Sequence, residues 1–101
     1  MTQEKLNPIH PGDVLLEEFL KPMGLNLERL ARDIGMPAKH IHEIVSAKRR
    51  ITANIALRLA RYFDMSPQFW LGLQMDHDLD LATDALANRL DGEVKSYAAT
   101  G

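Results

Sequence analysis

The chain has 101 residues, of which 46% are hydrophobic, 26% charged and 6% aromatic; its net charge is −2 and it contains no cysteine. This composition is that of one globular domain, and it excludes wholesale disorder, collagen-like structure, disulfide bridges, a thiolate zinc site and a cysteine nucleophile. Residues 1–10 lack the basic-then-apolar layout of a signal peptide, and no apolar run approaches the roughly 18 residues of a membrane span, so we expect a soluble, cytoplasmic protein without a membrane partner.

Apolar residues at helical spacing predict two helices in the first third of the chain. The first covers about residues 13–21 and is ended by Pro22 and Gly24. The second begins after Asn26, whose side chain suits an N-cap, and ends at Gly35, which is placed as a left-handed residue. The apolar positions of these two helices are Leu15, Leu16, Phe19, Leu20, Leu27, Leu30, Ala31 and Ile34.

Three more helices are predicted after this pair. The third starts with Pro37 as its first helical residue, and Thr52 caps the fourth. Ser66 and Pro67 open the fifth, in which Trp70 is expected to anchor the core. The apolar positions of these helices are Ile41, Ile44, Val45, Ile55, Ala56, Leu59, Ala60, Phe63, Phe69 and Leu73. No stretch alternates with period two, so the predicted fold class is all-α, with five helices and a longer C-terminal one.

A second apolar stripe lies on the last predicted helix, displaced around its axis from the side that carries Trp70. A helix that is apolar on two sides needs two partners, and we expect the second to be another copy of the chain, forming a homodimer. The alternative is a bent helix that buries both stripes within one chain. The domain is expected to span residues 1–86, followed by a flexible tail at residues 87–101. The stripe consists of Leu71, Met75, Leu79, Ala82 and Leu86.

The net charge hides a basic centre between two acidic ends. Residues 29–61 contain eight basic and two acidic side chains, a net charge of +6, whereas residues 1–28 carry −3 and residues 62–101 carry −5. Local potential steers association whatever the total charge is, so the centre of the chain is a candidate surface for DNA. The alternative is a solvated surface whose charge is merely uneven.

The second and third predicted helices form a helix–turn–helix pattern within the basic centre. In such a unit the N-terminal residues of the second helix contact base edges in the major groove, while flanking groups hold phosphates. Lys39 can donate to guanine, Glu43 can accept from cytosine, and Ala38 can contact a thymine methyl group. The expected base contacts are Ala38, Lys39, His40 and Glu43. The expected phosphate contacts are Lys48, Arg49 and Arg50, with the amide groups near Asn26 and Leu27.

The remaining chemically active residues predict no further site. His40 and His42 lie on different faces of a helix without a cysteine beside them, so no metal site is expected. Asp76, Asp78 and Asp80 mimic the opening of a calcium loop, but the later glycine and glutamate are missing, and we expect a solvated helix face. No glycine-rich phosphate loop or catalytic pair is present, so neither a cofactor nor an enzymatic activity is expected.

Two groups of residues resemble a known family. The segment from Gly24 to Gly35, with Ile41 and the run Lys48-Arg49-Arg50-Ile51, resembles the lambda-repressor-like (XRE) helix-turn-helix domain. His10-Pro11-Gly12-Asp13 near the start, combined with Phe69-Trp70-Leu71 and Leu73-Gln74 near the end, is similar to the HigA-type antitoxins. The resemblance covers residues 7–82, most of the chain.

The resemblance implies a lambda-repressor-like fold and the function of an antitoxin in a type II toxin–antitoxin module. Such a protein would bind a HigB-like toxin, an mRNA-cleaving ribonuclease, and would repress its own operon as a dimer on operator DNA. The chain departs from the family pattern at Ala47, where a glycine often stands; a left-handed turn there would cost alanine about 1 kcal/mol. The alternatives are a stand-alone regulator of the same fold without a toxin and, more distantly, a helical protein-binding module.

Overall fold

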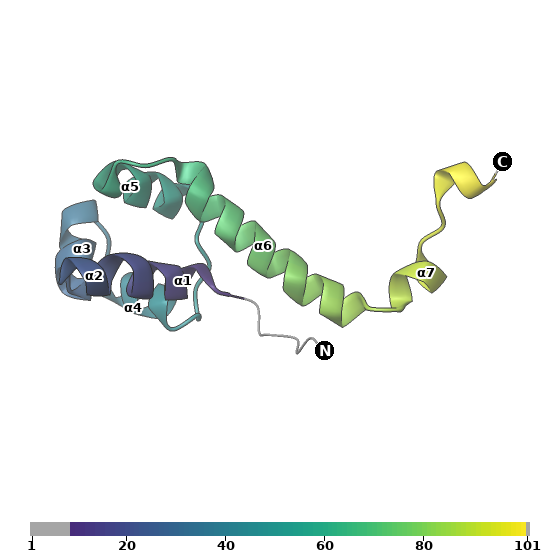
Figure 1. Cartoon of the computed structure of the whole chain (residues 1–101), viewed down its shortest axis with the longest axis horizontal. Helices are drawn as coiled ribbons and strands as arrows, with labels where there is room; N and C mark the ends of the chain where they lie inside the picture. The colour runs from purple at the N-terminus through teal and green to yellow at the C-terminus, as the bar shows by residue number, and fades with distance from the viewer. Residues whose placement is uncertain (1–8, 101) are drawn as a thin grey trace.

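In the computed structural model, which describes residues 9–100, the chain consists of helices joined by short connections (Figure 1). The helices form a packed head from which one long helix projects, and the principal dimensions are 57 × 35 × 23 Å. Residues 1–8 and residue 101 lie outside the described residues. The first of these belong to the segment without a signal-peptide pattern, and the last belongs to the expected tail. Within residues 9–100, no helix has both the length and the hydropathy that a membrane span requires.

The first predicted helix is present and begins at Pro11, two residues earlier than expected. It is a continuous run made of α1 (Pro11–Val14), the π-helical η1 (Leu15–Leu20) and α2 (Lys21–Met23). His10 caps its start, since the Nδ1 of His10 accepts a hydrogen bond of 2.9 Å from the amide of Gly12. Gly24 ends the run in the left-handed conformation, with a φ of 61°.

The predicted helix–turn–helix unit consists of α3 (Leu27–Ile34) and α4 (Ala38–Val45). Asn26 caps α3 as predicted, because its side-chain oxygen accepts a hydrogen bond of 2.7 Å from the amide of Arg29. Gly35 ends α3 with a φ of 72°, which confirms the predicted left-handed residue. The placement of Pro37 is wrong by one position: its ψ of 140° makes it the extended N-cap, and α4 begins at the next residue.

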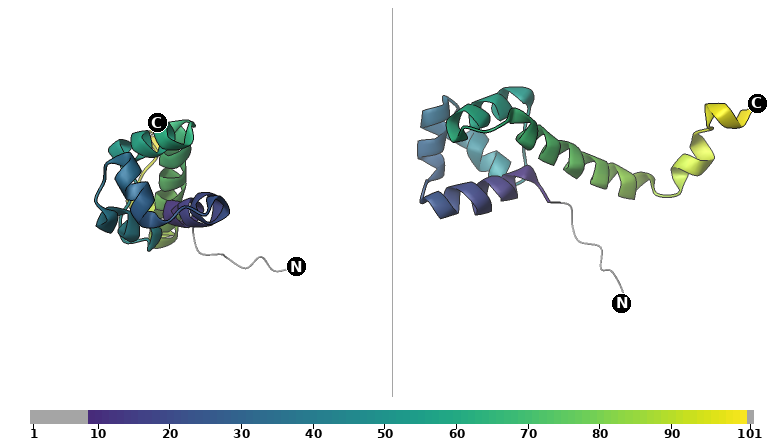
Figure 2. Two further views of the ribbon diagram at one scale, coloured as in Figure 1. Left: turned by 90° about the vertical axis from the view of Figure 1, so that its left-hand side faces the viewer. Right: turned by 45° about the horizontal axis from the view of Figure 1, so that its top comes forward.

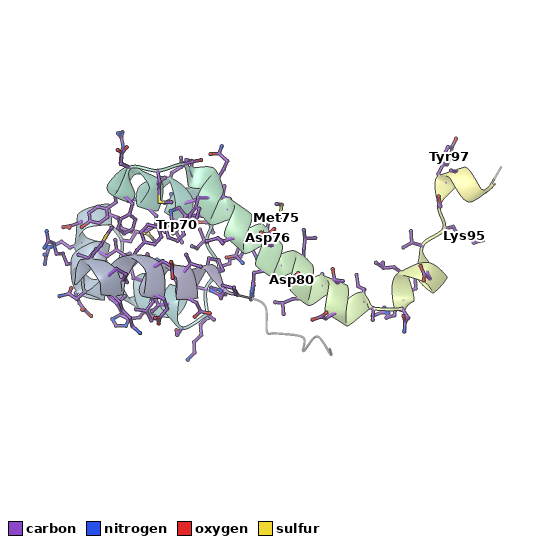
Figure 3. The ribbon with its side chains drawn as sticks, viewed as in Figure 1. Trp70, Met75, Asp76, Asp80, Lys95 and Tyr97 are labelled. Atoms are coloured by element: carbon purple, nitrogen blue, oxygen red, sulfur yellow. The ribbon has the colours of Figure 1, made fainter. Side chains whose placement is uncertain are left out.

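Two further helices complete the head, α5 (Ala53–Phe63) and α6 (Pro67–Leu86). Thr52 caps α5 with its side-chain oxygen as predicted, and Ser66, which is predicted to open the last helix, caps α6 in the same way. Trp70 is fully buried inside the head (Figure 3), and its ring centroid lies 5.0 Å from that of Phe19 and 5.1 Å from that of Phe69. Trp70 is therefore the core anchor that the sequence predicts. It is buried together with Leu15, Leu20, Leu30, Ile34, Ile41, Ile44, Ile51, Ile55 and Leu59.

The C-terminal half of α6 leaves the head, as Figure 1 and the right-hand view of Figure 2 show. Gln74 is the last buried residue of this helix, and Asp80 lies on the projecting part (Figure 3). Two short elements follow, α7 (Arg89–Glu93) and the 3-10 turn η2 (Tyr97–Thr100). The segment after residue 86 therefore has local helical structure, and its mobility stays a prediction.

The close approach of α1 to the end of α4 depends on Gly12. A Cβ at this position would lie 1.8 Å from the carbonyl oxygen of Ile44 and 3.0 Å from the Cα of Val45. Both neighbours are backbone atoms, so the two helices would have to separate to admit it. Because Gly12 has no side chain, the run of α1, η1 and α2, called the N-terminal helix from here on, can lie against α4.

We expect Gly12→Ala to lower the free energy of unfolding by about 1–3 kcal/mol, because the added methyl group overpacks this contact. Gly72→Ala is the matched control: Gly72 lies within α6, and a Cβ there would meet no atom within 4 Å. Alanine favours a helix over glycine by about 0.5–1 kcal/mol, so the control should gain stability. Urea unfolding of both variants measures the effects, and an unchanged stability of Gly12→Ala would contradict the role of Gly12.

Candidate nucleic-acid interface

The first turns of α4 hold the four residues predicted to contact bases. Lys39 is exposed, whereas Ala38, His40 and Glu43 are half-buried. Ala38 packs against the core, which uses part of its surface. The structure therefore brings these residues together on one helix and leaves Lys39 the most accessible to a ligand.

Glu43 and Arg49, which the sequence assigns to a base and a phosphate respectively, form an ion pair. The Nε of Arg49 donates to Oε1 of Glu43 at 2.8 Å. This hydrogen bond is the main cause that lowers the pKa of the Glu43 carboxyl group. A role for either side chain in DNA binding therefore requires the pair to open or to act as a unit.

The loop between α4 and α5, residues 46–52, is called the basic loop here and reverses direction at Ala47, whose φ is 62°. The amide of Ala47 donates to the carbonyl oxygen of Ile44 at 3.1 Å, and the amide of Lys48 donates to that of Glu43 at 2.8 Å. These bonds close the end of α4. The left-handed turn is thus kept although an alanine occupies it, at a cost of about 1 kcal/mol. Lys48, directly after the turn, is exposed.

Arg50 and Asp78 form an ion pair between this loop and α6. The Nη2 of Arg50 donates to Oδ2 of Asp78 at 2.6 Å, and the Nε2 of Gln74 donates to Oδ1 of the same carboxylate at 3.0 Å. These two bonds, with that of Arg50 the larger, lower the pKa of Asp78. The expectation of a solvated acidic face is therefore wrong for Asp78, while Asp76 and Asp80 are exposed as expected.

Gln74 fixes the backbone of the loop from within the head. Its buried Oε1 accepts a hydrogen bond of 2.7 Å from the amide of Ile51. Three residues after Gln74 on the same helix, the ring of His77 packs edge-on against the ring of His10, with centroids 4.9 Å apart. Burial, followed by the neighbouring His77, lowers the pKa of His10, which favours the neutral ring that caps the first helix. The N-terminal helix, the basic loop and α6 therefore meet at one junction.

The start of α3 carries a carboxylate beside the amide groups that were expected to bind phosphate. Asn26 is exposed and Leu27 half-buried. The Oε2 of Glu28, in the first turn, is hydrogen-bonded to the Nε2 of His42 at 2.9 Å, and this bond lowers the pKa of Glu28. The negative charge of Glu28 repels a phosphate at this helix end. The phosphate contact of the amide groups near Asn26 and Leu27 therefore stays a prediction, and the position of Glu28 argues against it.

The second apolar stripe of α6 is uncovered in the single chain. Leu71, Met75, Leu79 and Ala82 are exposed, and Leu86 is half-buried; Met75 is seen at the edge of the head in Figure 3. The first four line a groove together with Arg50, Ile51, Gln74 and Asp78. Within the described residues, α6 does not bend to bury both stripes.

A family model described as helix-turn-helix matches residues 16–70, more than half of the chain. The chain belongs to this family. The antitoxin HigA of Pseudomonas aeruginosa, solved with the higBA promoter, has a TM-score of 0.85 and 39% identity over 89% of this chain and 98% of that one. Virulence-associated protein I of Dichelobacter nodosus is 46% identical over 80 residues, 79% of this chain and 74% of the relative. Antitoxin HigA-1 of Vibrio cholerae is 33% identical over 81 residues, 80% of this chain and 74% of the relative.

These similarities confirm the resemblance to HigA-type antitoxins and the helix-turn-helix fold. The structure confirms the all-α class with a longer helix, α6, near the C-terminus, and adds the short α7 after it. The segment matched by the helix-turn-helix family begins in η1 and ends at Trp70. It contains α3, α4, the basic loop and α5, so the predicted base and phosphate contacts all lie inside it.

Two residues outside α3 and α4 hold the helix-turn-helix unit and the loop after it: Arg58 of α5 and Gln74 of α6. The Nη1 of Arg58 donates to the carbonyl oxygens of Ile34 at 2.8 Å and Gly35 at 3.3 Å, which closes the turn between α3 and α4. Arg58 therefore belongs to the scaffold although it contributes to the basic centre. Of these residues, only Gln74 could be recognised from the sequence. It stands one turn after Trp70 on the core side of α6, where a buried polar side chain needs a hydrogen-bond partner.

Proposed function

We propose that this chain is the DNA-binding antitoxin of a type II toxin–antitoxin module, which represses its own operon as a dimer and neutralises a HigB-like ribonuclease. The observation that carries DNA binding is the exposed Lys39 in the first turn of α4, beside the basic loop. The solved structure of the similar HigA with the higBA promoter supports the same interpretation. The proposal entails action by binding and not by catalysis, and a cytoplasmic location beside the chromosome.

On DNA, α4 lies in the major groove and the basic loop lies along the backbone. Lys39 donates to the O6 and N7 atoms of a guanine, and the methyl group of Ala38 contacts a thymine. Lys48 and Arg50 hold phosphates, because both are exposed in the loop that follows α4. Base contacts determine sequence preference, whereas phosphate contacts add affinity that falls with salt.

We expect Lys39→Ala to change the sequence preference of binding, at a cost of about 1–3 kcal/mol for the preferred site. Lys48→Ala is the matched comparison, since the same side chain is removed from the loop: it should weaken binding to all sequences about equally and reduce the slope of log K against log salt by about 1. Gel shifts on the DNA upstream of the protein's own gene, over a salt series, measure both. Uniform weakening by both variants would show that α4 is wrongly placed, and no complex at low salt would overturn DNA binding.

The dimer is proposed from the uncovered stripe on α6. Met75 and Leu79 expose 57% and 56% of their surface, which is costly for side chains gathered on one face. A second copy placed on the same stripe buries it on both chains, as a two-fold symmetric contact requires. Operator binding also favours a dimer, because two α4 helices then contact two half-sites.

We expect the wild-type protein to have the mass of a dimer in solution at micromolar concentration. Leu79→Glu places a charge in the stripe and should give a monomer that remains folded. Leu81→Glu is the control, because Leu81 is a similarly exposed leucine of α6 outside the stripe. Light scattering measures the masses, and a monomeric wild type would contradict the proposal.

The toxin contact is proposed for a groove between the N-terminal helix and the start of α6. Ile9 is 65% exposed there and Phe69 41%. The groove is lined by Ile9, Val14, Phe19, Phe69 and Leu73, with the carboxylates of Asp13, Glu17 and Glu18. The carboxylates of this groove form an acidic rim around its apolar side chains. This arrangement complements the basic surface that a ribonuclease toxin needs for binding RNA. This groove shares no lining residue with the predicted base and phosphate contacts.

We expect a HigB-like reading frame next to the protein's own gene and co-purification of its product with this chain. Glu18→Lys should abolish co-purification while leaving DNA binding intact, because it reverses one charge of the rim. Asp91→Lys reverses an exposed carboxylate of α7, away from the groove, and should have no effect. Absence of such a neighbouring gene, or of a complex with its product, would favour the stand-alone regulator instead.

A further inference from the structure

Adjacent residues of the basic loop are both held by α6. The carboxylate of Asp78 accepts from the guanidinium of Arg50 at 2.6 Å, and the side-chain oxygen of Gln74 accepts from the amide of Ile51 at 2.7 Å. Gln74 also donates to Asp78 at 3.0 Å, so three hydrogen bonds and the backbone between Arg50 and Ile51 together close a ring. Gln74 is 3% exposed, whereas the side chain of Arg50 is 61% exposed. Gln74 thus anchors the ring inside the head, while the guanidinium of Arg50 lies at the surface.

We propose that Gln74 and Asp78 are positioning residues for DNA binding: they hold Arg50 in the orientation in which it contacts a phosphate. This inference rests on the proposed DNA binding. An arginine presents five N–H donors in one plane, and the structure shows Asp78 bonded to a single nitrogen of Arg50. The remaining donors are left for a phosphate, while the loss of side-chain freedom has already occurred in the free protein.

The opposite effect, in which Asp78 competes with the phosphate for Arg50, is disfavoured by the geometry. Competition would require Arg50 to leave Asp78, but Asp78 is bonded to only one nitrogen of Arg50 and is kept in place by Gln74. The carboxylate therefore supports the guanidinium from one side. Since a guanidinium binds two anions on different edges, Arg50 need not leave Asp78 to contact DNA.

The same ring connects the loop to the proposed dimer contact. The groove that contains Arg50, Gln74 and Asp78 also contains Leu71, Met75 and Leu79. A second copy that covers these apolar side chains would lie beside the Arg50–Asp78 pair, with Arg50 at the edge of the contact, where it can still reach a phosphate. Dimerisation would then bring a second α4 and a second Arg50 to the operator.

The test is a mutant cycle on DNA binding by the full chain. We expect Asp78→Ala and Arg50→Ala each to weaken binding to operator and unrelated DNA about tenfold and to reduce the slope of log K against log salt by about 1. The double variant should bind as Arg50→Ala does, because Asp78 acts through Arg50. Asp78→Asn, which keeps an acceptor for Arg50, should retain more affinity than Asp78→Ala.

Asp80→Ala is the matched control, since it removes an exposed carboxylate of the same helix outside the ring (Figure 3). Circular dichroism and light scattering establish that each variant is folded and dimeric. Tighter binding and a steeper salt slope for Asp78→Ala would show competition and overturn the inference, as would unchanged binding, or a loss that persists without Arg50. If the wild type and Asp80→Ala also fail to bind any DNA, the proposed function itself is wrong.

Discussion

The indole of Trp70 lies fully buried where the N-terminal helix, α5 and α6 meet. The rings of Phe19 and Phe63 approach it with centroid distances of 5.0 and 6.5 Å, one from each neighbouring helix. Aromatic side chains contribute the largest buried areas in a small core, so this cluster determines the direction in which α6 leaves the head. The contacts of α6 with the basic loop depend on that direction, because Gln74 and Asp78 follow Trp70 on the same helix.

The basic centre divides into cations that support the fold and cations that remain available. Arg58 closes the turn between α3 and α4, and Arg49 is bonded to Glu43. Lys39 and Lys48 are exposed on α4 and on the loop. The net charge of +6 therefore overstates the number of charges that can meet a phosphate. The candidate DNA surface is therefore distinguished by the placement of a few cations around α4 and less by the total charge of the basic centre.

Features that depend on neighbouring residues could be predicted from the sequence. The caps at Asn26, Thr52 and Ser66 are local hydrogen bonds, and Gly35 is a local backbone preference. The prediction for Pro37 is wrong by one residue because the fixed φ of proline, here −62°, suits both an N-cap and a first helical residue.

Contacts between distant segments left little trace in the sequence. Asp78 stands 28 residues from Arg50, and Arg58 stands 24 residues from Ile34. Neither pair has a spacing that a helical period would bring together. Ala47 shows the converse: the local cost of its left-handed turn can be predicted from the sequence, but the tertiary structure imposes the turn regardless.

The projecting end of α6 has a further consequence for a dimer joined along its stripe. Such a dimer separates its two copies of α4 by a distance that the length and tilt of α6 determine, and half-sites on DNA repeat at one helical turn, about 34 Å. The spacing of an operator and its base sequence would then be specified by different helices. Either property could change in evolution while the other is retained.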